Sequence, residues 1–100
     1  MKNFRTFRLA VEFYQLASKL KVQQPLRNQL DRAASSIALN LAEGRGKRTT
    51  KDQVRFFSIA MGSLRECQAV LILAELENHP AWEKSDDLGA HLYRLIQNAR

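Results

Sequence analysis

The sequence predicts an all-α protein in which one domain, residues 1–100, folds as an antiparallel up-down bundle of four helices. Apolar residues recur at steps of three and four along four separate segments, which is the period of amphipathic helices. Glycine and proline are scarce, at four and two residues, and several fall where a helix should end. A chain of 100 residues that is 45% hydrophobic can build one small core.

The first two helices are predicted from periodicity and from their end residues. The first covers about Asn3–Lys21. The second begins near Pro25, because proline is favoured at the first helical position, and ends at Glu43, with Gly44 as the C′ residue. One narrow apolar stripe gives the second helix an ordinary core face: Leu26, Leu30, Ala34, Ile37 and Leu41.

The third predicted helix begins at Thr50, which matches a capping box with Gln53, and runs to about Glu77, before Asn78-His79-Pro80. Apolar residues cover more than half of its circumference. The central stripe is Phe57, Ala60, Leu64, Cys67, Leu71 and Ala74, flanked by Val54, Met61, Ile72 and Leu76 on one side and by Phe56, Ile59 and Val70 on the other. Because a chain this short has no large core, we expect this helix to be buried against another subunit of a homo-oligomer. The alternative is a well-packed monomer with scattered apolar residues on its surface.

A short connector containing Trp82 is expected before the fourth helix. Ser85 can cap that helix, and Asp86 and Asp87 would lie in its first turn, where the helix dipole favours negative charge.

A line of polar residues follows the second helix at three- and four-residue steps, about 120° from its core stripe: Gln29, Arg32, Ser36, Asn40 and Glu43. One interpretation is a hydrogen-bonded ladder that docks a partner helix or an RNA backbone. The alternatives are a half-buried polar seam that sets the register between helices, or a solvated face. Periodicity alone favours the two structural alternatives.

Charge is segregated along the chain. Residues 1–65 carry 13 Lys and Arg against 4 Asp and Glu, whereas residues 66–100 carry 3 against 6. A basic cluster joins a glycine-flanked loop to a helix N-terminus, where cations and backbone amides can hold phosphates: Arg45, Lys47, Arg48, Lys51 and Arg55. A solubilising loop has the same composition. No aromatic residues are obviously interleaved with the cluster, so any binding should be backbone-dominated and sensitive to salt.

Catalytic, metal and disulfide chemistry is not expected, so neither catalytic residues nor a cofactor are assigned. Three serines lack a nearby His–Asp arrangement: Ser35, Ser36 and Ser63. Cys67 lies on an apolar stripe, where a buried, inert thiol is expected, and His79 and His91 have no metal-binding spacing. One unpaired cysteine fits a reducing compartment. We expect a cytoplasmic protein without a membrane span, since the longest charge-free stretch, Ala33–Ala42, is ten residues.

Two segments carry a family resemblance. Residues 30–44, LDRAASSIALNLAEG, resemble the signature QLRRAAxSIxxNIAEG of the four-helix-bundle proteins that are also called ribosomal RNA intervening-sequence proteins. Residues 56–66, FFSIAMGSLRE, resemble the second signature, FLxIAxGSLxE. The likeness spans about Phe7–Leu76, and the residues after Leu76 depart from the usual hydrophobic continuation.

The resemblance implies a small bacterial homo-oligomer, typically a pentameric barrel of bundles, with no enzyme activity assigned. Some members are encoded within insertions of large-subunit ribosomal RNA genes. The family is also similar to the accessory variability proteins of diversity-generating retroelements, which are basic pentamers that bind nucleic acid and a reverse transcriptase. The positions that match the signatures are Arg32, Ser36, Asn40, Glu43, Gly44, Gly62, Ser63 and Glu66.

Some of these positions suggest specific contacts. Gly62 and Ser63 resemble a small-residue notch where another helix can approach closely. An ion pair between Arg32 and Glu66 is expected across two helices, as is a pair between Glu43 and a cation of the third helix. We interpret these as structural polar contacts.

The expected function is that of a non-enzymatic accessory protein that binds nucleic acid, with RNA favoured over DNA. The expected contacts are the five cations of the basic cluster, with Arg5 and Arg8 as lesser candidates. The alternative is a protein-interaction adaptor, for example one that docks onto a reverse transcriptase.

Overall fold

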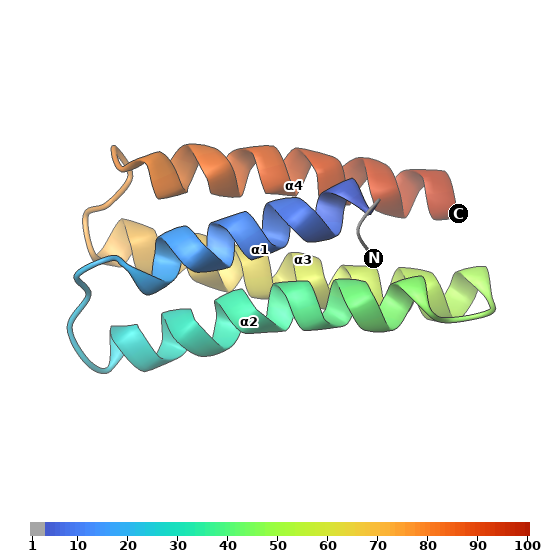
Figure 1. Ribbon diagram of the computed structural model, residues 1–100, viewed down its shortest axis with the longest axis horizontal. Coiled ribbons are helices and arrows are strands. Elements are labelled where there is room, and N and C mark those ends of the chain that lie inside the picture. Colours follow the sequence, from blue (N-terminus) through green and yellow to red (C-terminus); the bar gives the residue numbers. More distant parts are fainter. Residues whose placement is uncertain (1–3) are drawn as a thin grey trace.

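The computed structural model describes residues 4–100 and contains, within them, four α-helices and no strand (Figure 1). The helices are α1 (Arg5–Ser18), α2 (Leu26–Arg45), α3 (Thr50–Leu73) and α4 (Pro80–Ala99). The prediction of an all-α fold with four helices is confirmed.

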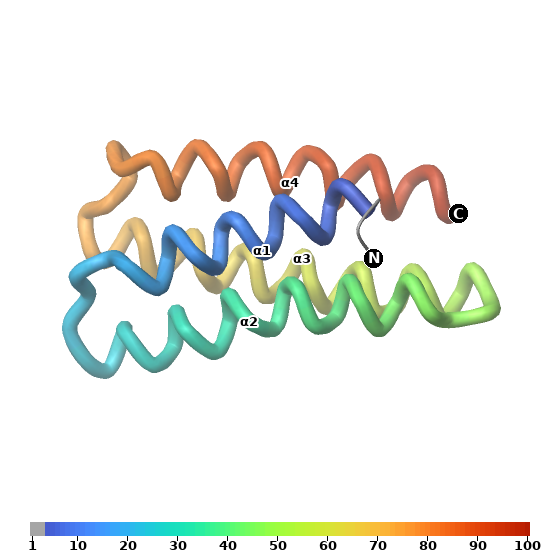
Figure 2. Tube along the Cα trace, in the orientation of Figure 1, coloured from blue at the N-terminus to red at the C-terminus, as the bar shows by residue number. Residues whose placement is uncertain are grey.

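The helices lie side by side along a molecule that measures 40 × 21 × 21 Å. The chain reverses direction at each connection (Figure 1). α1 packs against α2 and α4, and α3 packs against the same two helices. The short connection between α2 and α3 therefore lies at the same end as the start of α1 and the end of α4 (Figure 2).

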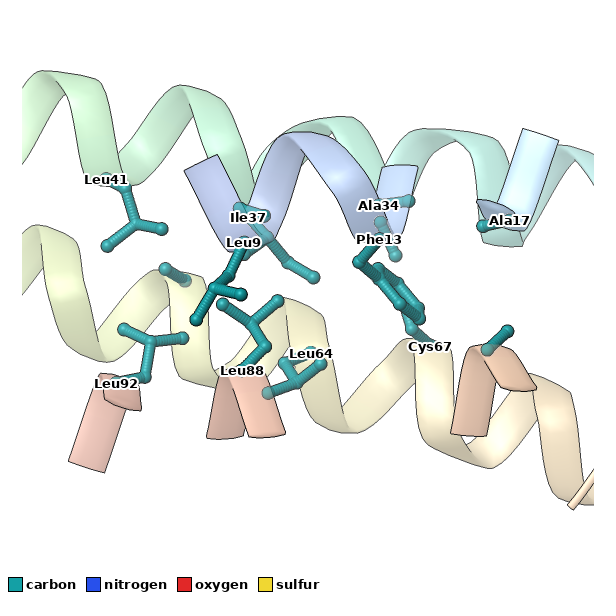
Figure 3. Packing of buried hydrophobic residues seen from close by; sticks show 14 of the residues in the cluster. Leu9, Phe13, Ala17, Ala34, Ile37, Leu41, Leu64, Cys67, Leu88 and Leu92 are labelled. Carbon is teal, nitrogen blue, oxygen red and sulfur yellow. The ribbon is translucent and has the colours of Figure 1, made fainter. Parts of the chain in front are cut away.

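Side chains from all four helices fill the common interior (Figure 3). The largest fully buried residues include Phe13 of α1, Ile37 of α2, Leu64 of α3 and Leu88 of α4. These residues recur at helical spacing on one face of each helix, as the periodicity predicts. Removing this apolar surface from water is the main force that holds the four helices together.

α1 ends at Ser18, earlier than the predicted Lys21, and the predicted start at Asn3 lies outside the described residues. Arg27 of α2 binds one backbone oxygen in the last turn of α1 and one just after it. The Arg27 guanidinium donates to the backbone oxygens of Leu20 and Ala17, at 2.7 and 3.0 Å. Arg27 also pairs with Asp31 one turn along α2. A cation at a helix C-terminus satisfies orphan acceptors and complements the dipole.

The predicted end of α2 is wrong by two residues. The helix continues to Arg45, its C-cap is Gly46, and Gly44 is a buried helical residue with an ordinary negative φ. The side chain of Phe57 occupies the space where a Gly44 side chain would begin. Gly44 therefore permits a close approach of α3 rather than a turn.

The predicted capping residue of α3 is also displaced by one position. The N-cap is Thr49, whose Oγ1 accepts from the Asp52 N–H at 3.1 Å. Gln53 is not a capping partner. Its Nε2 donates instead to the backbone oxygen of Lys47, at 3.0 Å, and so ties the loop to the helix.

α3 ends at Leu73, four residues before the predicted Glu77. Glu75 adopts a left-handed conformation with φ of 59°. The Leu76 N–H binds the Leu71 oxygen at 2.8 Å, and the Glu75 N–H binds the Ile72 oxygen at 3.0 Å. This is a Schellman motif whose C′ residue is not the usual glycine. Because no glycine marks the end of α3, the sequence pattern predicted a helix that is too long.

The predicted start of α4 at Ser85 is wrong. Pro80 occupies the first helical position, and the N-cap is His79, whose Nδ1 accepts from the Ala81 N–H at 3.0 Å. Trp82 therefore lies within the helix rather than in a connector. Ser85 is fully buried, donates to the Trp82 oxygen at 2.6 Å and accepts from Gln68 Nε2 at 3.0 Å. Asn78-His79-Pro80 was interpreted only as the end of the third helix, but proline is also favoured at the first position of a helix, and here it begins α4.

α3 is apolar beyond its core face. By length and composition alone, it is the one helix within residues 4–100 that could cross a membrane, with a mean hydropathy of 1.4 over 18 residues. The length of the longest charge-free stretch in the sequence did not reveal that α3 is this apolar. A core helix of a bundle can have the same composition, and α3 packs its core stripe into this bundle. Only 33% of the apolar window is buried within the protomer, however, and Ile59, Ile72 and Leu73 remain 41%, 48% and 68% exposed.

Candidate nucleic-acid interface

The basic cluster comes from residues in and next to the connection between α2 and α3. This connection lies at one end of the bundle (Figure 2). Residues 44–55 hold five cations and a single acidic residue, Asp52. Arg45 ends α2, Lys47 and Arg48 lie in the loop, and Lys51 and Arg55 lie in the first two turns of α3. All five cations thus lie in the segment that contains the N-terminus of α3, where free backbone N–H groups and the helix dipole also favour an anion.

Aromatic rings hold three of these cations, which the sequence analysis did not anticipate. The guanidinium carbon of Arg45 lies 4.5 Å from the centroid of the Phe4 ring. Lys47 Nζ and the guanidinium carbon of Arg55 lie 5.1 and 5.2 Å from the centroid of Phe56. Cation–π contacts of this kind restrain the long side chains. Phe56 adjoins Arg55 in the sequence, whereas nothing local connects Phe4 with Arg45.

Most of the positive charge of the cluster is not neutralised. Lys47 pairs with Glu43 at 3.1 Å. Within residues 4–100, the other four cations form no ion pair, and all four are solvent-exposed: Arg45, Arg48, Lys51 and Arg55.

The two lesser candidates lie on α1 near the same end of the bundle but outside the loop. Arg5 Nε donates to His91 Nε2 of α4 at 3.3 Å, and Arg8 is exposed. The charges of both arginines act on Glu12. Its pKa is lowered first by the hydrogen bond and charge of Lys84, 2.8 Å away, and then by the charges of Arg5 and Arg8.

The polar line of α2 faces α3. Ser36 Oγ and Ser63 Oγ lie 2.8 Å apart across the two helices. Asn40 Nδ2 donates to the backbone oxygen and to Oγ of Ser36, at 2.9 and 3.0 Å. These side chains are half-buried, so their hydrogen bonds set the register of α2 against α3. The line forms a polar seam at its centre, while Gln29 remains exposed.

Of the two ion pairs expected along this seam, one is present as expected. Arg32 Nη2 lies 2.9 Å from Glu66 Oε2, with side chains 72% and 44% exposed. The expected pairing of Glu43 with a cation of α3 is wrong, because Glu43 pairs with Lys47 in the loop.

Gly62 forms no notch within the protomer. It lies on the exposed side of α3, and a Cβ there would meet nothing within 4 Å. Ser63, by contrast, is directed at α2 through its bond to Ser36.

The other side chains that could take part in a reaction are either buried or already hydrogen-bonded. Cys67 is buried, and burial together with the charge of Glu66 raises the pKa of its thiol to about 12. Ser35 Oγ donates to the Arg32 backbone oxygen at 3.0 Å, and His91 Nδ1 lies 2.9 Å from the Asp87 oxygen. The described residues contain no group of three or more metal-ligating side chains.

A cavity of about 320 Å³, lined by residues of α2, α3 and α4, opens beside the basic cluster. It is lined by Arg45, Gln53, Phe57, Leu95, Asn98 and Ala99. Of these, only Arg45 was predicted as a functional residue, because the cavity joins segments that are far apart in the chain.

Comparison with known proteins agrees with this architecture. No curated protein matches the chain. A family model described as 23S rRNA-intervening sequence protein matches residues 4–100, so the match continues through α4, beyond the Leu76 limit of the sequence resemblance. The chain belongs to the 23S rRNA-intervening sequence protein family.

Proposed function

We propose that the protein is a non-enzymatic nucleic-acid-binding protein whose basic bundle end grips the sugar–phosphate backbone, and that RNA is its preferred ligand. The observation that carries this proposal is the group of four exposed, unpaired cations around the N-terminus of α3. The family description, which refers to ribosomal RNA, agrees with a role associated with RNA.

The geometry favours contacts with phosphates rather than the reading of a duplex sequence. Arginine guanidinium groups bind phosphate oxygens bidentately, and the first N–H groups of α3 can add to them. Such binding weakens steeply with salt because each phosphate contact releases counterions.

We further propose that the protein is a homo-oligomer, with five subunits as the family resemblance implies. Large apolar side chains on the outer surface support this proposal: Leu39 and Leu73 are each 68% exposed, and Ile59 and Ile72 add to them. The exposed Gly62 leaves room for a second chain to approach α3. An oligomer would present several basic ends to one strand, and simultaneous contacts would raise the overall affinity.

Binding to generic single-stranded RNA and DNA at two salt concentrations tests the proposal. Four phosphate contacts on a single strand predict a slope of log K against log [salt] of roughly −3. Arg48→Glu/Lys51→Glu should abolish most of the binding, because both side chains are exposed and unpaired. Lys19→Glu/Lys21→Glu is the matched control, since it changes the net charge equally at the other end of the bundle.

Three outcomes separate the alternatives. Loss of binding in the Arg48/Lys51 variant but not in the control supports the basic end as the interface. Equal loss of binding in both variants would show that binding depends only on the net charge of the protein. Weak binding by the wild type at either salt concentration would contradict the proposal and leave a protein-interaction adaptor, for example for a reverse transcriptase, as the better account.

A further inference from the structure

The cavity beside the basic cluster has two chemically different parts. Leu95 and Ala99 of α4 give it an apolar wall, and Phe57 of α3, whose ring is 3% exposed, adds only a small surface to it. Arg45 and Asn98 bring a guanidinium and a carboxamide to the same space, and Gln53 adds a second carboxamide. An apolar wall with a few convergent polar groups is the usual form of a small-ligand site.

The polar groups of this cavity have unused hydrogen-bonding capacity. Within residues 4–100, the side chains of Arg45 and Asn98 form no hydrogen bond, although Arg45 is held from one side by the Phe4 ring, 4.5 Å away. Gln53 uses one N–H of its Nε2 on the Lys47 oxygen, which leaves its Oε1 free as an acceptor. Donors and acceptors are therefore both available for a ligand.

We propose that this cavity holds one unstacked base of a single-stranded nucleic acid whose phosphates lie on the adjacent basic cluster. The inference rests on the proposed function and adds to it a site for the base. A carboxamide matches the mixed donor and acceptor edge of a nucleobase, and apolar or aromatic surfaces cover its face.

Size and position support a base over other ligands. A volume of about 320 Å³ is at the lower end of the ~300–1,000 Å³ typical of ligand pockets, which suits a single planar ring system. A phosphate alone would leave the apolar wall uncovered, and a purely apolar ligand would make no use of the Arg45 guanidinium or the Asn98 carboxamide. Arg45 belongs to both the cluster and the cavity. A base bound in the cavity would therefore belong to the same strand whose sugar–phosphate backbone is held by Arg48 and Lys51.

The decisive comparison uses two probes with the same backbone charge: a short single-stranded oligonucleotide and its abasic counterpart of equal length. We expect the complete oligonucleotide to bind about tenfold more tightly, with the same salt slope, because only its base can cover the apolar wall and bond to the carboxamides. Equal affinity for the two probes would overturn the base site and leave the backbone interface intact.

Two variants locate the effect. Asn98→Leu removes the free carboxamide at similar size, and Ala99→Leu fills the cavity; neither changes the charge. Both should bring the complete oligonucleotide down to the affinity of the abasic strand. Gln97→Leu, on the same exposed turn but outside the cavity lining, is the control and should bind like the wild type.

Side-chain amide resonances provide a second measurement that does not depend on the variants. Addition of the complete oligonucleotide should shift the Asn98 and Gln53 NH₂ signals, whereas the abasic strand should leave them in place. Shifts of equal size with both strands would assign the cavity to phosphate and overturn the proposal. If the wild type binds none of the probes, both the base site and the proposed function fail.

Discussion

Gly44 and Phe57 are packed so closely that no larger residue fits at position 44. A Cβ atom there would lie 2.7 Å from Phe57 Cε1, 2.9 Å from Cδ1 and 3.0 Å from Phe56 Cβ. The Phe57 ring is 3% exposed and is enclosed by the core, so it cannot move aside freely. This contact determines how closely α2 and α3 approach each other immediately before the loop of the basic cluster.

Gly44→Ala should therefore destabilise the protein, although alanine normally strengthens a helix. Overpacking costs ~1–3 kcal/mol, which exceeds the ~1 kcal/mol gain in helix propensity. Denaturant unfolding measures the difference. Gly46→Ala is the matched control, since a Cβ at Gly46 meets only backbone oxygens at 3.7 Å and beyond, and its free energy of unfolding should change little. An unaltered midpoint for Gly44→Ala would show that the ring yields.

Glu75→Gly should stabilise the protein. Glu75 is the left-handed residue that ends α3, with φ of 59°, and a side chain there costs about 1 kcal/mol relative to glycine. The expected gain in the free energy of unfolding is ~0.5–1 kcal/mol, reduced by the greater backbone freedom of glycine in the unfolded chain. Glu77→Gly removes the same charge two residues later, where no positive φ is needed, and should bring no gain.

The Cys67 thiol should be inert in the folded protein and reactive only after unfolding. It is fully buried, and its pKa is raised to about 12. At pH 8, labelling by a thiol reagent should follow the rate at which the native structure opens. Fast labelling of the native protein would contradict the burial of Cys67.

The same shift predicts a loss of stability at high pH. The folded state keeps its proton at Cys67 up to about pH 12, whereas an exposed thiol releases it near pH 9. Stability is therefore fully present below pH 9 and falls between pH 9 and 12, because the folded state then binds more protons. In Cys67→Ala this component of the pH dependence should vanish.

Leu39→Gln and Leu73→Gln should weaken self-association without unfolding the protomer. Both leucines are 68% exposed in the single chain, and exposed substitutions usually change stability by less than ~0.5 kcal/mol. Light scattering should show a lower mass at equal helix content by circular dichroism. Ala90→Gln, on the exposed side of α4, is the control. An unchanged mass in both leucine variants would remove these side chains from the proposed subunit interface.

The candidate site was predictable only in part. The cations of the loop are contiguous in the sequence, and the loop keeps them together in any fold, so the cluster could be named in advance. The Phe4 ring beneath Arg45 and the Asn98 carboxamide beside it could not, because they come from opposite ends of the chain. The polar line on α2 could be predicted from its helical spacing. That Ser63 is its partner follows only from the packing of α3 against α2.

The sequence by itself determined that the chain forms helices, roughly where they lie, which faces are apolar and where positive charge gathers, because helical period and charge are local properties. The tertiary structure decided what individual residues do at the junctions: Gly44 admits a ring instead of ending a helix, Pro80 starts α4, and Glu75 takes the place of a glycine. Each of these roles depends on groups brought close by packing, and spacing along the chain does not encode that proximity.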